Sequence, residues 1–515
     1  MQKRTFSSIA RVLAIISITV FTSSAALGRG AKKNSMQAAH AHLDGSTWPM
    51  PAGGLWRTSA VTGAGLPRGV KSKDLVTRSV ELPSIPFYGV TFADDAVYIL
   101  GGSPAFMPFF LASDMGATQA DLQALLQQEL ANQGGDPGMI PYLAKVDLKT
   151  FHVQKLDLPP GPTINYIGGI VSHEDGKIYV VDTSELYEID PAKMVITRQI
   201  DLPTIDSPNP FGPANFFTTY NGIQISPGNG DIILKSTDFT GLNPIGPIFE
   251  VDPATMTIHN LFTAAVGTSR MTAASQHGKN YLYLPGLLNS RRFEITGNGF
   301  TEDVNWSKPY RSDTDGTTQG TAMVYMGQRK SVVWSGNGTV LLGVMSPLGI
   351  YSQSTVNSRP VVSERSVATT KPGGSFFMPA GDPFRSGMLL VQDAVNNALA
   401  GWQSGQNGRL RKVWENDRLH TTAGAAISSD SGQIYIDDRR CDDGGNCRLY
   451  LVVLDLATGK EIARTRVAGT VASIAHIFIG KHEVFFIASE IGKTNGYLTG
   501  VRAITRSDRD RYDKH

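Results

Sequence analysis

Apolar and polar residues alternate along most of this chain, in short runs that turn residues separate. Residues 75–82 (LVTRSVEL) alternate at a period of two, which is typical of a half-buried β-strand. In 168–182, two apolar runs flank a Gly-containing turn, and residues 222–236 and 424–438 follow the same plan. The pattern predicts a chain built from antiparallel hairpins.

A short phrase recurs where a strand meets its turn. It reads LYEIDPAKM at 186–194 and IFEVDPATM at 248–256, and weaker copies lie at 143–150 and 453–460. Each copy is an apolar strand that ends in an Asp-initiated turn. A unit of this kind that recurs at roughly 40 to 60 residues is typical of a β-propeller blade. The sequence therefore predicts an all-β fold, a single β-propeller, in which this phrase builds blades and contacts no ligand.

The spacing of the repeated Asp predicts the number of blades. It falls at 147, 190, 252 and 455, and the last gap of 203 residues holds four steps of about 51 or three of about 68. Four steps favour eight blades, and seven is the alternative. The last unit has three strands, at 472–479, 483–488 and 497–504, so strand 75–82 is expected to supply the fourth. Pairing of the N- and C-terminal strands would then close the ring and remove its open edges.

The chain is expected to divide into a signal peptide (1–28), a flexible N-terminal lead-in (29–73), the propeller (74–506) and a charged tail (507–515). Basic residues precede the apolar run 12–21, as in an export signal. That run is too short to span a bilayer, and no other apolar segment approaches the required length. We therefore expect a soluble periplasmic or secreted protein with no membrane span after signal removal. Sec and twin-arginine export both stay open.

Residues 103–141 interrupt the first blade. Thr118 is expected to cap a helix with a stripe of leucines at 122, 125, 126 and 130. This helical insertion either packs on the propeller face or forms a lid over the central channel, with the aromatic loop 106–110 beside the ligand.

Composition and cysteine usage narrow the possible partners. The net charge is +2 and 18% of residues are charged, so no basic field is present for nucleic acid. Cys441 and Cys447 flank a Gly- and Asn-rich loop. A loop of this kind brings two thiols within bonding distance, and an exported protein meets oxidising conditions. A structural disulfide is expected.

The candidate site lies where the loops before each innermost strand and between the second and third strands meet. We call this the upper face, and the opposite one the lower face. Aromatic, amide and basic residues gather there, at the mouth of the channel, and could hydrogen-bond a polar ligand: Phe87, Tyr88, Asn165, Tyr166, Tyr220, Asn221, Arg270, Gln319 and His420.

Other polar residues have weaker claims. His173 and His277 are expected to be exposed on the lower face, and His476 to lie in an innermost strand. Carboxylates end several second strands and could converge on calcium: Asp182, Asp238, Asp393, Asp437 and Asp438. Standard catalytic signatures, such as a Gly-x-Ser-x-Gly elbow or a His-Glu-x-x-His helix, are absent from the sequence.

The phrase at 454–462 (LDLATGKEI) resembles repeats of the YVTN and quinoprotein-like propeller superfamily. That resemblance implies the propeller fold, and in some members pyrroloquinoline quinone with calcium. Three functions stay open. The favoured one is an exported propeller that binds a small molecule or protein partner at the upper channel mouth. The alternative is a calcium-dependent hydrolase of the lactonase or esterase type, with Asn165 and Asn221 as metal ligands. A quinone-dependent oxidoreductase is the third.

Overall fold

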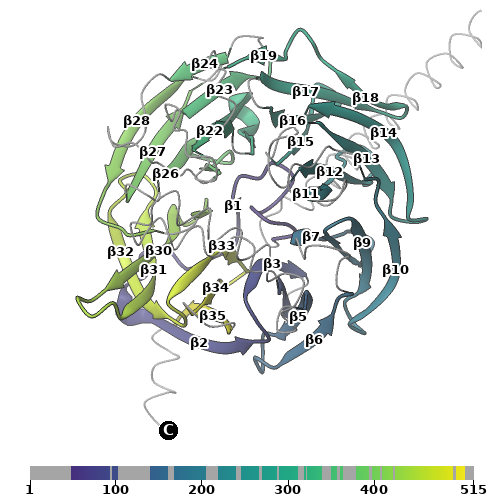
Figure 1. Ribbon diagram of the computed structural model, residues 1–515. Coiled ribbons are helices and arrows are strands. Elements are labelled where there is room, and N and C mark those ends of the chain that lie inside the picture. Colours follow the sequence, from purple (N-terminus) through teal and green to yellow (C-terminus); the bar gives the residue numbers. More distant parts are fainter. Residues whose placement is uncertain are drawn as a thin grey trace, which may run out of the picture.

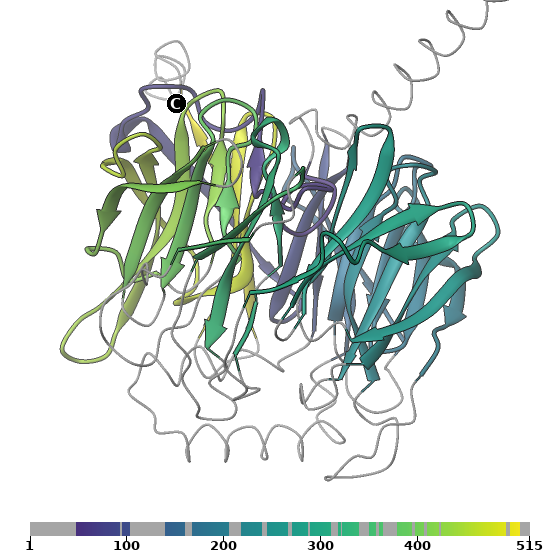
Figure 2. The ribbon, with the colours of Figure 1, turned by 90° about the horizontal axis from the view of Figure 1, so that it is seen from above.

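The chain forms a closed ring of eight four-stranded antiparallel sheets, each one blade of a β-propeller (Figure 1). This confirms the eight-bladed all-β fold. Seen edge-on, the strands run through the thickness of the ring (Figure 2). The computed structural model describes residues 48–504 except 93–94, 103–139, 160–166, 205–217, 239–244, 266–269, 287–288, 311–317, 321, 339–349, 357–359, 364–377, 394–396, 406–408, 422–423 and 491–494.

Blades 1 to 4 follow one another along the chain. Blade 1 contains β3 (Pro86–Phe92), β4 (Ala96–Gly101), β5 (Tyr142–Asp147) and β6 (Val153–Asp157). Blade 2 contains β7 (Ile167–Ser172), β8 (Ile178–Asp182), β9 (Glu185–Asp190) and β10 (Val195–Asp201). Blade 3 contains β11 (Thr218–Ile225), β12 (Ile232–Asp238), β13 (Ile245–Asp252) and β14 (Thr257–Ala265). Blade 4 contains β15 (Thr272–Gln276), β16 (Lys279–Pro285), β17 (Asn289–Thr296) and β18 (Gly299–Glu302), and β19 (Lys308–Pro309) also pairs with β17.

Blades 5 to 8 complete the ring. In blade 5, β20 (Thr318–Gly320) and β21 (Val324–Tyr325) both pair with β22 (Ser331–Gly338), before β23 (Ile350–Ser354) and β24 (Pro360–Ser363). Blade 6 contains β25 (Ala380–Gly381), β26 (Met388–Asp393), β27 (Ala398–Ser404) and β28 (Leu410–Asn416). Blade 7 contains β29 (Ala426–Ser428), β30 (Gln433–Cys441), β31 (Cys447–Asp455) and β32 (Glu461–Val467). Blade 8 contains β33 (Val471–Ile479), β34 (Glu483–Ser489), β35 (Gly496–Ala503) and β2 (Leu75–Leu82). Two short 3-10 helices, η1 (Ser72–Asp74) and η2 (Gly327–Arg329), lie among the described residues.

The ring closes as the sequence predicts. Strand β2, from the N-terminal part of the chain, pairs antiparallel with the C-terminal strand β35 along its whole length, from Leu75 opposite Ala503 to Leu82 opposite Gly496. A parallel contact between Tyr88 of β3 and Ala475 of β33 then joins blades 1 and 8 into one eight-stranded sheet. Closure removes the sheet edges that would otherwise pair with other chains.

The repeated Asp builds the turn between the third and fourth strands. Asp190 ends β9, and its Oδ1 accepts hydrogen bonds from the backbone N–H groups of Ala192 (3.0 Å) and Lys193 (3.1 Å). These bonds hold the pKa of Asp190 below its usual value. Asp147 makes the same two contacts, with Lys149 (2.9 Å) and Thr150 (2.6 Å). The phrase therefore has a local structural role on the lower face.

Apolar side chains fill the spaces between blades. In the cluster between blades 2 and 3, Tyr179 and Val181 of β8 pack with Ile223 and Ile225 of β11, and all four are at most 3% exposed. Strands buried on both faces in this way read as nearly continuous apolar runs. Among the described residues, no helix is long and apolar enough to cross a membrane.

Most of the described part of the expected lead-in lies inside the ring, before the chain reaches β2 at its outer rim (Figure 1). Residues 48–66, which we call the axial segment, are largely buried, with Trp48, Leu55 and Leu66 each 2% exposed. The flexible lead-in predicted for 29–73 is therefore wrong for residues 48–66, where apolar side chains enter the blade cores. The predicted signal peptide, helical insertion and charged tail lie outside the described residues.

The axial segment visits all eight blades in order. Its backbone carbonyls accept hydrogen bonds from the innermost strands of blades 1 to 7, at Thr91, Ser172, Gln224, Ala273, Tyr325, Gly381 and Ile427. In blade 8, the backbone N–H of Gly65 donates to the carbonyl of Gly480, which follows β33. Residues Ala60–Val61 form β1, a short strand parallel to β29 of blade 7. Most of these contacts fall near the ends of the innermost strands, so the segment lies toward the lower face of the ring.

Candidate functional site

Two of the residues predicted for the site meet at the centre of the ring. Arg270 lies two residues before β15 of blade 4, and Tyr88 lies in β3 of blade 1. The Arg270 Nη2 donates a hydrogen bond to the Tyr88 hydroxyl, and its guanidinium carbon lies 4.9 Å from the centre of the Tyr88 ring. Blades 2 and 3 separate blades 1 and 4 around the ring, so this contact crosses its interior.

Tyr88 is held firmly in this position. It is 1% exposed, and its ring packs edge-on against Phe87 with the ring centres 4.7 Å apart. A guanidinium over an aromatic face gains electrostatic attraction, which increases when water is excluded. Tyr88 thus fixes the position of Arg270 without neutralising its charge.

The axial segment adds a second arginine to this centre. Arg57 is 2% exposed, and its backbone has φ +50°, in the left-handed region. Burial lowers the pKa of Arg57 to about 10. Burial and then the positive charge of Arg57 lower the pKa of Arg270 to about 9. The two guanidinium groups are therefore near enough to repel one another.

Neither arginine has a neutralising partner among the described residues. The salt bridges of that part of the chain include neither Arg57 nor Arg270, and the Nε of Arg57 has no hydrogen-bond acceptor there. Buried charges are normally paired, because an unpaired one costs several kcal/mol. As far as the described residues show, the centre of the ring therefore carries two positive charges and an unpaired N–H donor, the Arg57 Nε.

The other predicted ligand-binding residues are placed differently. Tyr220 is fully buried in the core between blades 2 and 3, where it packs on Phe249 and donates to the Pro203 carbonyl at 2.5 Å. Asn221, in β11, is 4% exposed, whereas the side chain of His420 is exposed at the edge of blade 7. Gln319 lies in β20, opposite Asn337. Asn165 and Tyr166 lie outside the described residues, as does the side chain of Gln319.

The carboxylates that end second strands belong to separate environments. Asp182 of blade 2 is 1% exposed, and burial raises its pKa to about 7. Asp438 of blade 7 is neutralised by Arg440 (2.8 Å) and Arg464 (3.0 Å). Asp437 is fully buried beside it in β30. The side chains of Asp238, Asp393 and His476 lie outside the described residues.

One of the two lower-face histidines differs from expectation. His277 is exposed as predicted, but His173 is only 5% exposed. Its Nε2 lies 2.7 Å from the Gly230 carbonyl oxygen and its Nδ1 lies 3.0 Å from Asp175. The prediction that His173 is exposed is wrong, because this side chain bridges the hairpin turns of blades 2 and 3.

The disulfide is confirmed. Cys441 and Cys447 are bonded at 2.00 Å and face each other in register at the tip of the β30–β31 hairpin. The hairpin tip around them is exposed. The bond therefore closes a surface loop of blade 7, in agreement with a structural role.

Sequence reasoning missed Arg57, which is the most deeply buried charge of the site. A signal for it exists, because Trp48, Met50, Leu55 and Trp56 make residues 48–56 unusually apolar for a surface linker. The segment has no helical or strand period, so the pattern alone predicted a loose lead-in.

Comparisons with known proteins bear on the fold. No protein-family model matches the chain, and no curated protein matches it. Among solved structures, the chain is similar to the quinohemoprotein alcohol dehydrogenase ADHIIG from Pseudomonas putida HK5, with a TM-score of 0.51, 9% identity, and coverage of 89% of this chain and 80% of that one. It also matches the WD40 domain of SCAP from fission yeast (TM-score 0.45, 8% identity, coverage 84% and 99%) and the dihydro-heme d1 dehydrogenase NirN (TM-score 0.41, 12% identity, coverage 78% and 80%). At these identities the similarity concerns the fold alone, which is a β-propeller, in agreement with the eight blades described above.

Proposed function

We propose that this chain is an exported β-propeller that binds an anionic small molecule at the centre of its ring. The observation that carries the proposal is a pair of neighbouring guanidinium groups, the buried Arg57 and the partly buried Arg270, neither of which has a carboxylate partner among the described residues. The sequence favours a propeller that binds a polar ligand, and the arginine pair makes an anion the expected kind of ligand.

The chemistry of the pair favours a carboxylate or phosphate. A guanidinium presents a planar fork of N–H donors that matches two oxygens of such a group. Bound between Arg57 and Arg270, an anion would accept from the free Nε of Arg57 and remove the repulsion between the two charges. A neutral ligand would leave both charges buried and uncompensated. The binding free energy is therefore expected to depend on the charge of the ligand.

The resemblance also implies a quinone cofactor, and the residues described here do not fit it. In the quinoprotein dehydrogenases the quinone lies against a ring formed by adjacent cysteines. In this chain Cys441 and Cys447 are six positions apart and close an exposed hairpin tip in blade 7. No step of the proposed function involves a quinone.

Export rests on two features. The basic and apolar N-terminus has the layout of a signal peptide. The Cys441–Cys447 bond is typical of oxidising compartments such as the periplasm or the cell exterior.

Calorimetric titration of the purified chain tests the proposal. The probes are inorganic phosphate, succinate and citrate, with glucose as the neutral control. We expect at least one anion to bind, and Arg270→Gln and Arg57→Gln to weaken it by about 10-fold or more, since each removes a charge-assisted contact. Arg418→Gln, at an exposed arginine, is the matched control and should leave affinity unchanged.

Two results would overturn the proposal. One is that no probe binds the wild-type chain, and the other is that both arginine variants bind as tightly as the wild type. Calcium-dependent hydrolysis of an ester, abolished by Asn221→Ala, would favour the hydrolase instead.

A further inference from the structure

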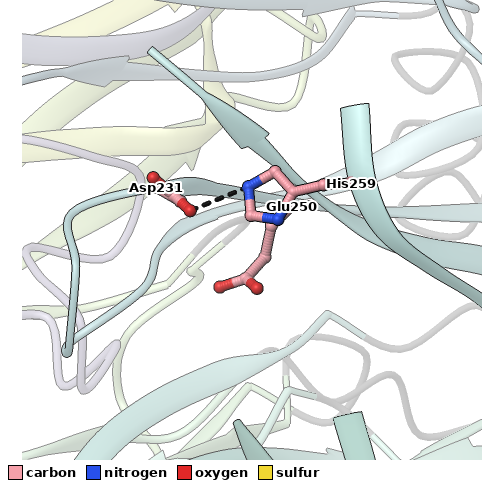
Figure 3. Close-up of side chains that lie close together, drawn as sticks. All are labelled: Asp231, Glu250 and His259. Carbon is pink, nitrogen blue, oxygen red and sulfur yellow. Dashed lines mark ion pairs between the residues drawn. The ribbon is translucent and has the colours of Figure 1, made fainter. Parts of the chain in front are cut away.

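A second group of polar side chains gathers on the lower part of blade 3, away from the arginine pair. Asp231 directly precedes β12, Glu250 lies in β13 and His259 lies in β14. One ligand atom from each side chain lies within 4.8 Å of the other two. Figure 3 shows the Asp231 carboxylate and the His259 ring pointing toward one another, with the Glu250 carboxylate close by. The strand register places Glu250 directly opposite His259.

Only part of this cluster is satisfied by protein contacts. The His259 Nε2 lies 2.9 Å from Asp231 Oδ2, and Asn260 donates to Glu250 Oε2 at 2.7 Å. Glu250 is fully buried, yet its Oε1 has no hydrogen-bond partner in the described part of the chain. Ser226 is 2% exposed and its hydroxyl also lacks one. That hydroxyl lies next to the Glu250 carboxylate.

The charge balance of the cluster calls for a cation. Two carboxylates share one imidazole here, and Glu250 is fully buried, away from water. A buried carboxylate oxygen without a donor loses its hydration and gains nothing in return. A divalent ion would supply the missing charge and occupy the orphaned oxygen.

The geometry suits a small transition-metal ion. Ligand atoms at zinc bond lengths of about 2.1 Å are about 3.4 Å apart around a tetrahedral ion. The His259–Asp231 contact at 2.9 Å needs to open by less than 1 Å, which side-chain rotation provides. Two carboxylates and an imidazole are ligands that zinc accepts, whereas calcium prefers oxygen alone. The His259 side chain is 37% exposed, so the ion can enter from solvent.

We propose that Asp231, Glu250 and His259 form a divalent-metal site of the zinc class that ties together three strands of blade 3. The buried hydroxyl of Ser226 or a water molecule would complete the coordination. This site is independent of the anion site, since it lies at a different place in the fold and uses none of its residues.

Zinc titration of the full mature chain, free of any histidine tag and treated with chelator, tests the proposal. We expect one zinc ion per chain, and an increase in the melting temperature when zinc is added, because an ion that binds only the folded state stabilises it. Cobalt in place of zinc should give the strong visible absorption of a four-coordinate ion. Loss of a ligand should weaken binding by about 100-fold or more, given that loss of outer-sphere partners alone costs 10–100-fold.

Glu250→Gln and His259→Gln are the test variants. His259 is partly exposed, so its variant keeps the test valid if the change at the buried Glu250 prevents folding. His152→Gln, at an exposed histidine in blade 1, should bind zinc as the wild type does. The proposal is overturned if zinc leaves the wild-type melting temperature unchanged, or if His259→Gln binds zinc with unchanged affinity.

Discussion

Lys235 provides a direct test of how this ring tolerates buried charge. It lies in β12 of blade 3 and is fully buried. Its Nζ donates to the Ser236 carbonyl at 3.1 Å, and burial lowers the pKa of Lys235 to about 7. Its carbon chain packs over Gly222, near Met271. Lys235→Met keeps an unbranched side chain of similar length and removes the charge.

The sign and size of the effect follow from proton linkage. Unfolding returns Lys235 to its ordinary pKa of 10.5, so between pH 7 and pH 10.5 the unfolded chain binds more protons than the folded chain. Wild-type stability therefore rises with pH across this interval. Integrated from about pH 6 to about pH 9, the contribution of Lys235 amounts to about 3 kcal/mol. The methionine variant lacks this contribution, so its advantage over the wild type is largest at the acidic end.

Urea unfolding at several pH values measures the difference. The wild type and Lys235→Met are compared by the urea concentration at which half of the protein is unfolded. The comparison requires that the free energy of unfolding depends equally steeply on urea in both, which means that their unfolded states match. Lys460→Met, at an exposed lysine in the turn after β31, controls for loss of a positive charge and should follow the wild-type profile. Parallel pH profiles for the wild type and Lys235→Met would refute the reasoning, because they would mean that Lys235 is uncharged in both states or solvated in the fold.

Two further predictions concern packing and backbone strain. Leu55→Ala, in the axial segment, should lower the free energy of unfolding in urea by about 2–5 kcal/mol, because Leu55 is 2% exposed within the blade core. The control Leu261→Ala, at a leucine that is 54% exposed, should lower it by less than about 0.5 kcal/mol. Equal losses would mean that the segment is not part of the folded core. Gly459→Ala should lower the melting temperature more than Gly176→Ala. Both glycines have positive φ (+67° and +85°), but only at 459 would the new Cβ overlap a side chain, that of Trp414. Equal decreases would mean that backbone strain alone causes the loss and that the overlap with Trp414 contributes nothing.

The blade repeat was readable from sequence because its cause is local. The Asp190 carboxylate bonds to N–H groups two and three residues later, so the turn has a fixed sequence spacing. Closure by 75–82 was also predictable, since an alternating strand without a blade of its own must pair somewhere. Tyr88 and Arg270 were predicted as candidates from their place before or within innermost strands. Their direct contact was not predictable, because it joins residues 182 positions apart.

The axial segment could not be placed from sequence for a physical reason. Its backbone has no regular period, and Ala52, Arg57 and Ser59 all have positive φ. Its conformation depends on successive hydrogen bonds to eight different blades, the last of them at Gly480, which follows β33. A segment of this kind acquires its structure from the ring, and neither propensity nor periodicity records that dependence.

This dependence has a consequence for the candidate site. Arg270 belongs to blade 4, but Arg57 belongs to a segment that is anchored by hydrogen bonds to all eight blades. Both guanidinium groups therefore lie together only in the closed propeller with the axial segment docked. By contrast, an arginine paired with a carboxylate of its own blade could form that pair before the ring closes, and the pair would carry no net charge. Two like charges brought together by closure lower the stability of the fold, and the proposed anion would offset that cost only in the completed ring.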